Sequence, residues 1–191
     1  MTPRERVLRT ASKLFYAEGI RAVGVDRIAA EAGVSKMTLY RHYPTKDDLV
    51  VAVLEARDEP ARNLLHAASE HAADTARDRL LACFAMLSPW FASRGFRGCP
   101  FMNASLELAD PAHPARAVAE RHKTATRDQF AALARELEVA EPDALADQLA
   151  LVFDGAIAQA QMRDAAAAAT AALAAATALL DAATGARQQS A

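Results

Sequence analysis

Cysteines and metal-binding motifs are scarce in this sequence. Among its 191 residues only Cys83 and Cys99 are cysteines, too few for a disulfide framework and without the CxxC spacing of a metal or redox motif. The five histidines show no HxH, HxxH or HExxH spacing. We therefore expect no metal site and no cofactor. The sequence also has no GxGxxG, P-loop or GxSxG stretch, so no motif indicates an enzyme.

Long apolar runs and strand patterns are also missing. No run approaches the roughly eighteen uninterrupted apolar residues of a membrane span, and the N-terminus lacks the apolar stretch of a secretion signal. We therefore expect a cytoplasmic protein. Glycine and proline are few, at seven and eight residues, whereas alanine recurs throughout and 52% of the residues are apolar. This composition favours helices around a real core, so the predicted fold class is all-α.

Charge is unevenly distributed along the chain. Residues 1–46 contain nine basic and four acidic side chains, a net charge of +5, so the remainder of a chain of net charge −2 carries −7. A basic head joined to an acidic body suggests that the head meets a polyanion. A patch of this size is also common on ordinary protein surfaces, so the charge alone does not decide the function.

Helical periodicity and capping signals predict about nine helices. Pro60 is expected to bend or divide the fourth helix, because proline removes a backbone donor. The last helix contains thirteen alanines in nineteen positions, which allows a close approach by a neighbouring helix. The predicted helices cover residues 3–19, 26–32, 36–43, 46–58, 75–93, 101–109, 114–137, 142–157 and 165–183.

The second and third predicted helices have the layout of a helix-turn-helix. Each has about two turns, and the Gly33-Val34-Ser35 turn between them places a glycine where a left-handed residue is needed. Leu39 and Tyr43, four positions apart, should face inward. The side chains left on the outer surface are hydrogen-bond donors, one aromatic residue and one thioether: Lys36, Met37, Thr38, Tyr40, Arg41 and His42.

Such a helix fits the major groove of duplex DNA, where its exposed side chains reach base edges and its flanking cations meet phosphates. Lys46 and the amides at the start of the next helix form a second anion site just beyond Pro44. Periodicity alone is equally consistent with a small surface helix whose charged face is solvated.

Three stretches carry a specific resemblance: ASKLFYAEG, VDRIAAEAGVSKMTLYRHY and PTKDDLV. In order, spacing and residue type they make the first 50 or so residues similar to the DNA-binding domain of TetR-family transcription regulators. The resemblance implies an all-α homodimer that binds the two halves of a palindromic operator and holds a small-molecule effector in its body. It implies base or adjoining backbone contacts for Lys36, Thr38 and Tyr40, and mainly phosphate contacts for Ser35, Arg41, His42 and Lys46.

The chain departs from the family pattern at two positions. Gly24 stands where Ser or Thr is common ahead of the second helix, which puts a hydroxyl contact to phosphate there in doubt. Met37 stands where glycine, alanine or a polar residue is frequent, and it is expected to contact a thymine methyl or to shield the groove edge.

The predicted domains are residues 1–46 for DNA binding, joined by the helix at about 46–58, residues 47–185 for ligand binding and dimerisation, and a flexible tail at 186–191.

The body gathers aromatic and thioether side chains near the RGFRGCPFMN loop. Most of these are expected to be core, but a pocket in a helical bundle would use the same lining with a few polar groups. The candidate ligand-binding residues are Trp90, Phe91, Phe101, Met102, Asn103, Glu107, His122 and Gln159. The apolar helix from Pro142 and the alanine-rich helix after it are the candidates for the dimer interface.

Three functions remain open from the sequence. The first is a ligand-responsive repressor acting on operator DNA, with a variant in which Cys99, close in sequence to Arg94 and Arg97, senses electrophiles or oxidants. A plain buried cysteine is the competing interpretation of Cys99. The second function is a helical architectural or interaction module without specific DNA binding, and the third is an enzyme in the helical body.

Overall fold

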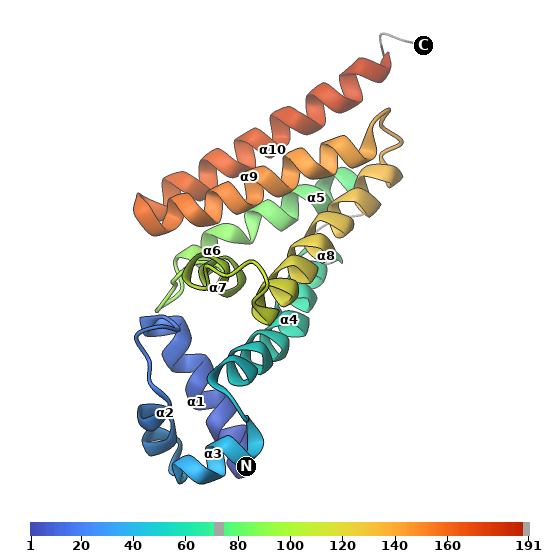
Figure 1. Cartoon of the computed structure of the whole chain (residues 1–191). Helices are drawn as coiled ribbons and strands as arrows, with labels where there is room; N and C mark the ends of the chain where they lie inside the picture. Colours follow the sequence, from blue (N-terminus) through green and yellow to red (C-terminus); the bar gives the residue numbers. More distant parts are fainter. Residues whose placement is uncertain (71–74, 189–191) are drawn as a thin grey trace. The chain divides into compact units, whose positions relative to one another are not determined.

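The computed structural model describes residues 1–70 and 75–188, with side chains described as far as Gly185. Every regular element in these residues is an α-helix, so the all-α prediction is confirmed (Figure 1). The helices are α1 (Pro3–Glu18), α2 (Val25–Ala32), α3 (Lys36–His42), α4 (Lys46–Glu70), α5 (Ala76–Ala85), α6 (Leu87–Phe91), α7 (Pro100–Glu107), α8 (Pro114–Glu136), α9 (Pro142–Met162) and α10 (Ala165–Gln188).

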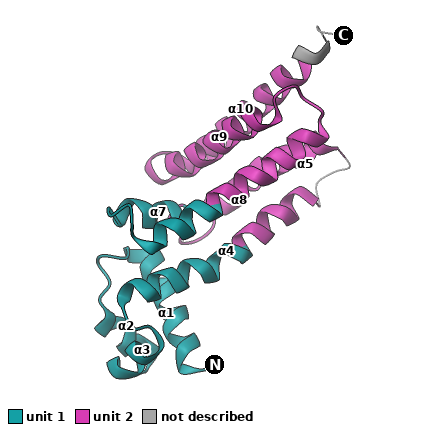
Figure 2. Cartoon of the chain, turned by 45° about the vertical axis from the view of Figure 1, so that its right-hand side comes forward, with its two compact units in different colours: residues 1–60, 99–122 teal, residues 61–98, 123–191 magenta. Residues whose placement is uncertain are grey.

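The chain packs into two compact units (Figure 2). Unit 1 combines residues 1–60 with residues 99–122, and unit 2 combines residues 61–98 with the chain from residue 123 onward. Helices α4 and α8 therefore each contribute one end to unit 1 and the other to unit 2. Because α7 packs within unit 1, that unit is larger than the DNA-binding domain predicted for residues 1–46, and the predicted domain boundary stays a prediction.

Helix α1 begins and ends as its sequence predicts. Thr2 accepts a hydrogen bond from the Glu5 amide while the Glu5 carboxylate accepts one from the Thr2 amide, which satisfies two donors at the start of the helix. Gly19 ends the helix with φ 94° and ψ 154°, a positive φ that favours glycine. The apolar face of α1 is buried, with Val7 fully enclosed.

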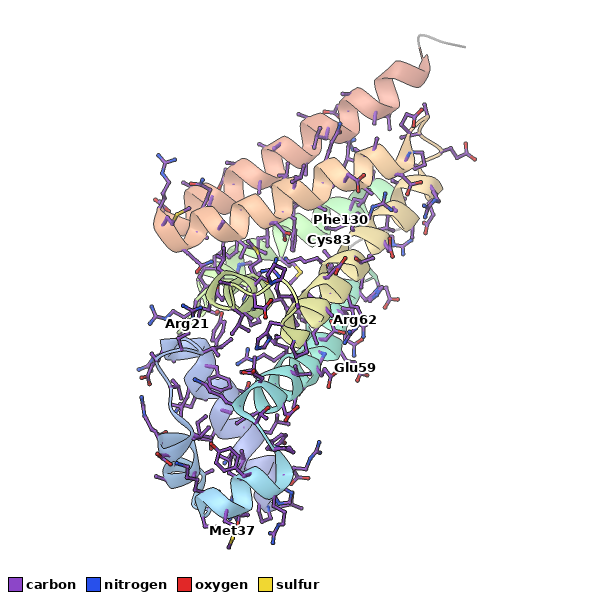
Figure 3. The ribbon with its side chains drawn as sticks, in the orientation of Figure 1. Arg21, Met37, Glu59, Arg62, Cys83 and Phe130 are labelled. Carbon is purple, nitrogen blue, oxygen red and sulfur yellow. The ribbon has the colours of Figure 1, made fainter. Side chains whose placement is uncertain are left out.

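The core of unit 2 is built around three phenylalanines on three helices. Phe84 of α5 lies 5.8 Å from Phe130 of α8 and 5.6 Å from Phe153 of α9, measured between ring centroids. Phe130 and Phe153 complete the triangle at 5.6 Å. Figure 3 shows Cys83 and Phe130 inside this bundle. Helix α10 packs against α9 and α5, which places the alanine-rich helix in the bundle.

Several predicted helix limits differ from the structure. Helix α4 continues through Pro60 to Glu70 instead of ending near Asp58, so Pro60 does not divide it. The buried Leu65 and Ser69 lie beyond the proline, and their packing offsets the missing backbone hydrogen bond. The predicted helix 75–93 is divided into α5 and α6 at Met86.

At its C-terminal end the chain stays helical further than predicted. Helix α10 continues to Gln188, into the tail predicted to be flexible from residue 186, and the rest of that predicted tail lies outside the described residues. Residues 165–185 are also long and apolar enough, by length and composition alone, to cross a membrane, although Thr170, Thr177 and Asp181 interrupt the apolar run. Asp181 in this helix pairs with Arg77 of α5 at 2.6 Å, a contact that belongs to a helical bundle.

Candidate nucleic-acid interface

The turn between α2 and α3 has the predicted geometry. Gly33 adopts the left-handed conformation, φ 64° and ψ 42°, and its amide donates to the Ala30 carbonyl at 3.1 Å. The Arg6 side chain of α1 donates to the carbonyls of Ala32 and Gly33 at 3.0 and 3.2 Å. Arg6 therefore braces the turn from the neighbouring helix, a role that sequence reasoning missed because the partners are 26 and 27 positions apart.

Helix α3 is held by a cap and an apolar inner face. The Ser35 hydroxyl accepts from the Thr38 amide at 3.0 Å, which caps the helix N-terminus. Leu39 is fully buried and Tyr43 is 3% exposed. The Tyr43 hydroxyl donates to the Arg4 carbonyl at 3.4 Å, and burial raises the pKa of Tyr43. Helix α3 is thus fixed to α1 by its inner face, as the four-residue spacing of Leu39 and Tyr43 predicts.

The outer face of α3 is open to solvent. Met37 is 81% exposed and its side chain projects away from the rest of unit 1 (Figure 3). Tyr40 is 38% exposed, and Arg41 is exposed without a hydrogen bond or ion pair to any described residue. Thr38 and His42 are half-buried. This face presents hydroxyl, cationic and thioether groups, which are the group types that meet base edges and phosphates.

Lys36 is exposed but already has an anionic partner. Its Nζ lies 2.7 Å from the Asp26 carboxylate at the start of α2, and this hydrogen bond raises the pKa of Lys36. To contact DNA, Lys36 must therefore either give up its ion pair with Asp26 or bind DNA and Asp26 at the same time. Both side chains are more than half exposed, so solvent screens the pair and phosphate can displace it.

Lys46 makes a structural contact as well as lying beside the recognition helix. Its Nζ donates to the Ile20 carbonyl in the α1–α2 connection at 2.6 Å and lies 5.9 Å from the centre of the Phe15 ring. Partial burial lowers its pKa below the ordinary 10.5. An ammonium has three donors, so this hydrogen bond leaves two for phosphate.

One predicted contributor to the basic head is neutralised locally. Arg27 of α2 pairs with Glu18 and with Glu31, and these hydrogen bonds, Glu18 first, raise the pKa of Arg27 further above its ordinary value. The net charge of +5 for residues 1–46 already counts these two acidic partners, but Arg27 itself is engaged within the head. On α3 itself the cations Lys36 and Arg41 are exposed, and Lys46 is partly exposed at the start of α4.

Comparisons with known proteins agree with this geometry. The profile described as "Bacterial regulatory proteins, tetR family" matches residues 7–53. The structure is similar to SCO4454, a TetR-family transcriptional regulator from Streptomyces coelicolor, with 35% identity, a TM-score of 0.89, and coverage of 95% of this chain and 96% of that one. This chain belongs to the TetR family. It is therefore a DNA-binding transcriptional regulator, and its family and relatives are regulators rather than enzymes.

Other relatives extend over most of the chain. The regulatory protein TetR from Rhodobacter sphaeroides is 28% identical, with a TM-score of 0.75 over 88% of this chain and 95% of that one. The HTH-type transcriptional regulator YjdC of Escherichia coli is 28% identical over 156 residues, 82% of each protein. The likeness thus includes the helical body, which motifs alone do not identify.

In unit 1 of this TetR-family regulator, the predicted ligand-binding residues fall into two groups. Phe101 of α7 stacks on His122 of α8 at 3.7 Å, and the His122 Nδ1 lies 2.8 Å from the Asp58 carboxylate of α4. Asn103 and Glu107 instead line a hollow between α1, α4 and α7. Met102 is half-buried on α7.

The predicted residues of unit 2 also occupy separate places. Trp90 and Phe91 of α6 cluster with Phe96, with ring centroids 5.0 to 5.7 Å apart. Gln159 is exposed near the end of α9, at a shallow surface depression shared with α10. The ligand-binding set therefore stays a prediction, and the structure brings together only parts of it.

The two cysteines are both buried. Cys99 is 3% exposed at the start of α7. Cys83 is fully buried in unit 2, where burial raises the pKa of its thiol to about 12. An electrophile would need a local opening to reach either thiol. Among residues 1–70 and 75–188 no group of His, Cys, Asp or Glu is arranged to hold a metal ion.

Proposed function

We propose that this regulator is a ligand-responsive repressor that binds a palindromic operator as a homodimer in the cytoplasm and leaves it when a small molecule binds. The observation that carries the DNA part is the division of α3 into two faces. Leu39 and Tyr43 fasten one face to α1, while Met37, Tyr40 and Arg41 project from the other. A rigid helix with such a face fits the major groove.

Within this proposal the residues have separate roles. Lys36, Met37, Thr38 and Tyr40 read base edges or the adjoining backbone, and Ser35, Arg41, His42 and Lys46 hold phosphates. The α4 N-terminus supports the second group, because Thr45 and Asp48 cap it reciprocally and keep its first turn in place. Phosphate contacts set position and affinity, whereas base contacts set sequence preference.

A homodimer is proposed because two half-sites need two recognition helices at a fixed spacing, about 34 Å for adjacent turns of DNA. Support for α9 and α10 as the interface comes from apolar side chains left exposed on α9. Leu151 is 74% and Met162 is 69% exposed in the single chain. The small side chains of α10 permit a close approach by a second copy. Sedimentation of the purified protein should therefore give a dimer.

Selection of bound sequences from a pool of random DNA duplexes tests the proposal. The expected product is an inverted repeat, whose half-site separation gives the spacing of the recognition helices. Binding that depends on salt but enriches no sequence would instead favour an architectural module. A screen of small molecules for release of the selected operator then tests the ligand response, and a reporter gene behind that operator distinguishes repression from activation.

Ligand release requires unequal affinity. The dimer has one conformation in which the distance between its two DNA-binding heads matches the operator and another in which it does not. The effector must bind the second conformation more tightly, because equal affinity for both would leave their populations unchanged. The thiol-sensor variant is disfavoured by the burial of Cys99. Unchanged operator affinity after an electrophile has demonstrably labelled Cys99 would eliminate it.

A further inference from the structure

Arg57 of α4 is a partly buried cation without an anionic partner. Its Nε donates to the Ser12 hydroxyl at 2.8 Å and its Nη2 to the Ser12 carbonyl at 2.9 Å, both on α1. Among the residues that the structure describes, no carboxylate lies within ion-pair distance of this guanidinium. Partial burial removes water from the guanidinium and so lowers the pKa of Arg57.

The guanidinium retains unused donors. An arginine has five N–H groups, and Ser12 accepts two of them. The guanidinium carbon also lies 4.8 Å from the centre of the Tyr16 ring, a cation–π contact that helps the two hydrogen bonds to Ser12 hold the group in place. An oriented guanidinium with free donors is the geometry that binds a carboxylate through two parallel hydrogen bonds.

Arg57 lines the hollow within unit 1. This open hollow lies between α1, α4 and α7, and its empty space, solvent at the mouth included, is about 350 Å³. Phe15, Val53, Leu54 and Ala104 give it mainly apolar walls, and Asn103 adds an amide. Glu107 also lines the hollow, where its carboxylate accepts a hydrogen bond from the Arg21 amide at 3.0 Å. The apolar walls and the Arg57 cation suit a small molecule that has an apolar or aromatic body and one carboxylate placed at Arg57, away from Glu107.

We propose that the hollow between α1, α4 and α7 is an effector site for a small amphipathic carboxylate, with Arg57 as its anion anchor. The proposal rests on the proposed ligand-responsive function and supplies a ligand class for it. It differs from the predicted ligand-binding set, of which only Asn103 and Glu107 lie at this hollow.

Occupancy of this site would act on the DNA-binding head directly. Only about 20 Å³ of the hollow can take the centre of a water-sized molecule, so a ligand has to separate its walls. One wall is the Val50–Arg57 segment of α4, and α4 begins only three residues after α3 ends. A carboxylate that takes the guanidinium from Ser12 would release α4 from α1 and so change the position of α3.

Benzoate is the probe that tests the site, with benzamide as the neutral molecule of the same shape and sodium chloride as the ionic-strength control. Calorimetric titration of the full-length protein should give saturable benzoate binding, and the melting temperature should rise with benzoate concentration. Benzamide should bind at least about tenfold more weakly, because it cannot make the charge-assisted pair.

Three variants separate an anion site from a structural brace. Arg57→Met should weaken benzoate binding about tenfold or more, and Arg57→Lys should weaken it less because the charge remains but the fork is lost. Ser12→Ala removes a competing acceptor, so benzoate should bind at least as tightly as to the wild type. The matched control is Arg121→Gln, which removes an exposed arginine of unit 1, 3.7 Å from Glu55, and should leave benzoate binding unchanged.

Two outcomes overturn the proposal: no saturable benzoate binding to the wild type, or equal affinity in the wild type and in both Arg57 variants. If Arg57→Met does not fold, Arg57→Lys and Ser12→Ala still decide the matter. These measurements use no DNA, so they can fail while operator selection succeeds. Conversely, a protein that binds benzoate through Arg57 but selects no operator would refute the proposed function and leave the site intact.

Discussion

Replacement of Lys46 by methionine separates two roles that the structure and the sequence assign to one side chain. Lys46 donates to the Ile20 carbonyl, which ties the start of α4 to the α1–α2 connection. The family resemblance implies that the same ammonium also contacts a DNA phosphate. Lys46→Met keeps the apolar stem near Phe15 and removes only the charge and its donors.

The stability effect follows from two opposing contributions. A hydrogen bond from a charged donor contributes about 1.5–3 kcal/mol. Part of it is offset because burial disfavours the ammonium, the cause of its lowered pKa, and because the side chain stays partly in solvent. We therefore expect a net loss of about 1 kcal/mol, a decrease in melting temperature of about 2–4 °C for a chain of this length.

The effect on DNA binding is measured through its salt dependence. Each phosphate contact contributes about 0.9 to the slope of log K against log salt, so the slope for Lys46→Met should be smaller by about that amount on specific and random duplexes alike. Lys46→Arg should restore the slope. A slope equal to the wild type's, together with the expected loss of stability, would show that Lys46 only braces the α1–α2 connection and would refute its phosphate role.

The pH dependence of stability gives an independent check on Lys46. Because the pKa of Lys46 is lower in the folded chain than its ordinary 10.5, the unfolded chain holds more protons between the two values. The wild type should therefore gain stability relative to Lys46→Met as pH rises through this interval. Denaturant titrations of both proteins at several alkaline pH values measure the difference, and a constant difference would contradict the assigned burial.

Four further substitutions test α3 and the start of α2. Thr38→Ala and Tyr40→Phe should change the sequences enriched in a selection experiment, and equal losses on every sequence would refute their role in base reading. Leu39→Ala should destabilise the protein by about 2–5 kcal/mol in denaturant titrations and abolish operator binding, because it empties a fully buried site. Gly24→Ser should stabilise the folded protein by roughly 0.5–1 kcal/mol. The backbone at Gly24, φ −83° and ψ 151°, suits an N-cap residue, and a Cβ placed there meets no atom within 4 Å. An unchanged melting temperature would contradict this expectation.

The local features of the head were predictable from the sequence. Ser35 as a cap, Gly33 in the left-handed region and Leu39 facing inward all depend on residues within one or two helical turns of each other. Helix capping and the 3.6-residue helical period depend on residues close together in the sequence, so the neighbouring residues are enough to predict these features. The recognition surface was predicted as the complement of these positions.

The partners of the charged residues were not predictable in the same way. Lys36 and Asp26 lie on different helices, and Lys46 meets a backbone carbonyl 26 positions away. Their distances depend on how α1, α2 and α4 pack, which single-residue preferences do not encode. Charge counting therefore treated Lys36 and Lys46 as free cations, whereas the structure shows both already engaged.

The ligand-binding region also could not be predicted from the sequence, because it too depends on how the helices pack. Clustering of aromatic residues near residues 90–102 suggested a pocket, yet aromatic side chains of α6 pack on each other and Phe101 stacks on His122. Mutual packing of this kind fills space and does not enclose it. The hollow instead forms where three helices of unit 1 meet around Arg57, which makes no ion pair with any described residue although Glu107 also lines the hollow. A partly buried charge without an ion-pair partner is a property of the folded environment, so only the packed structure can point to a ligand that would neutralise it.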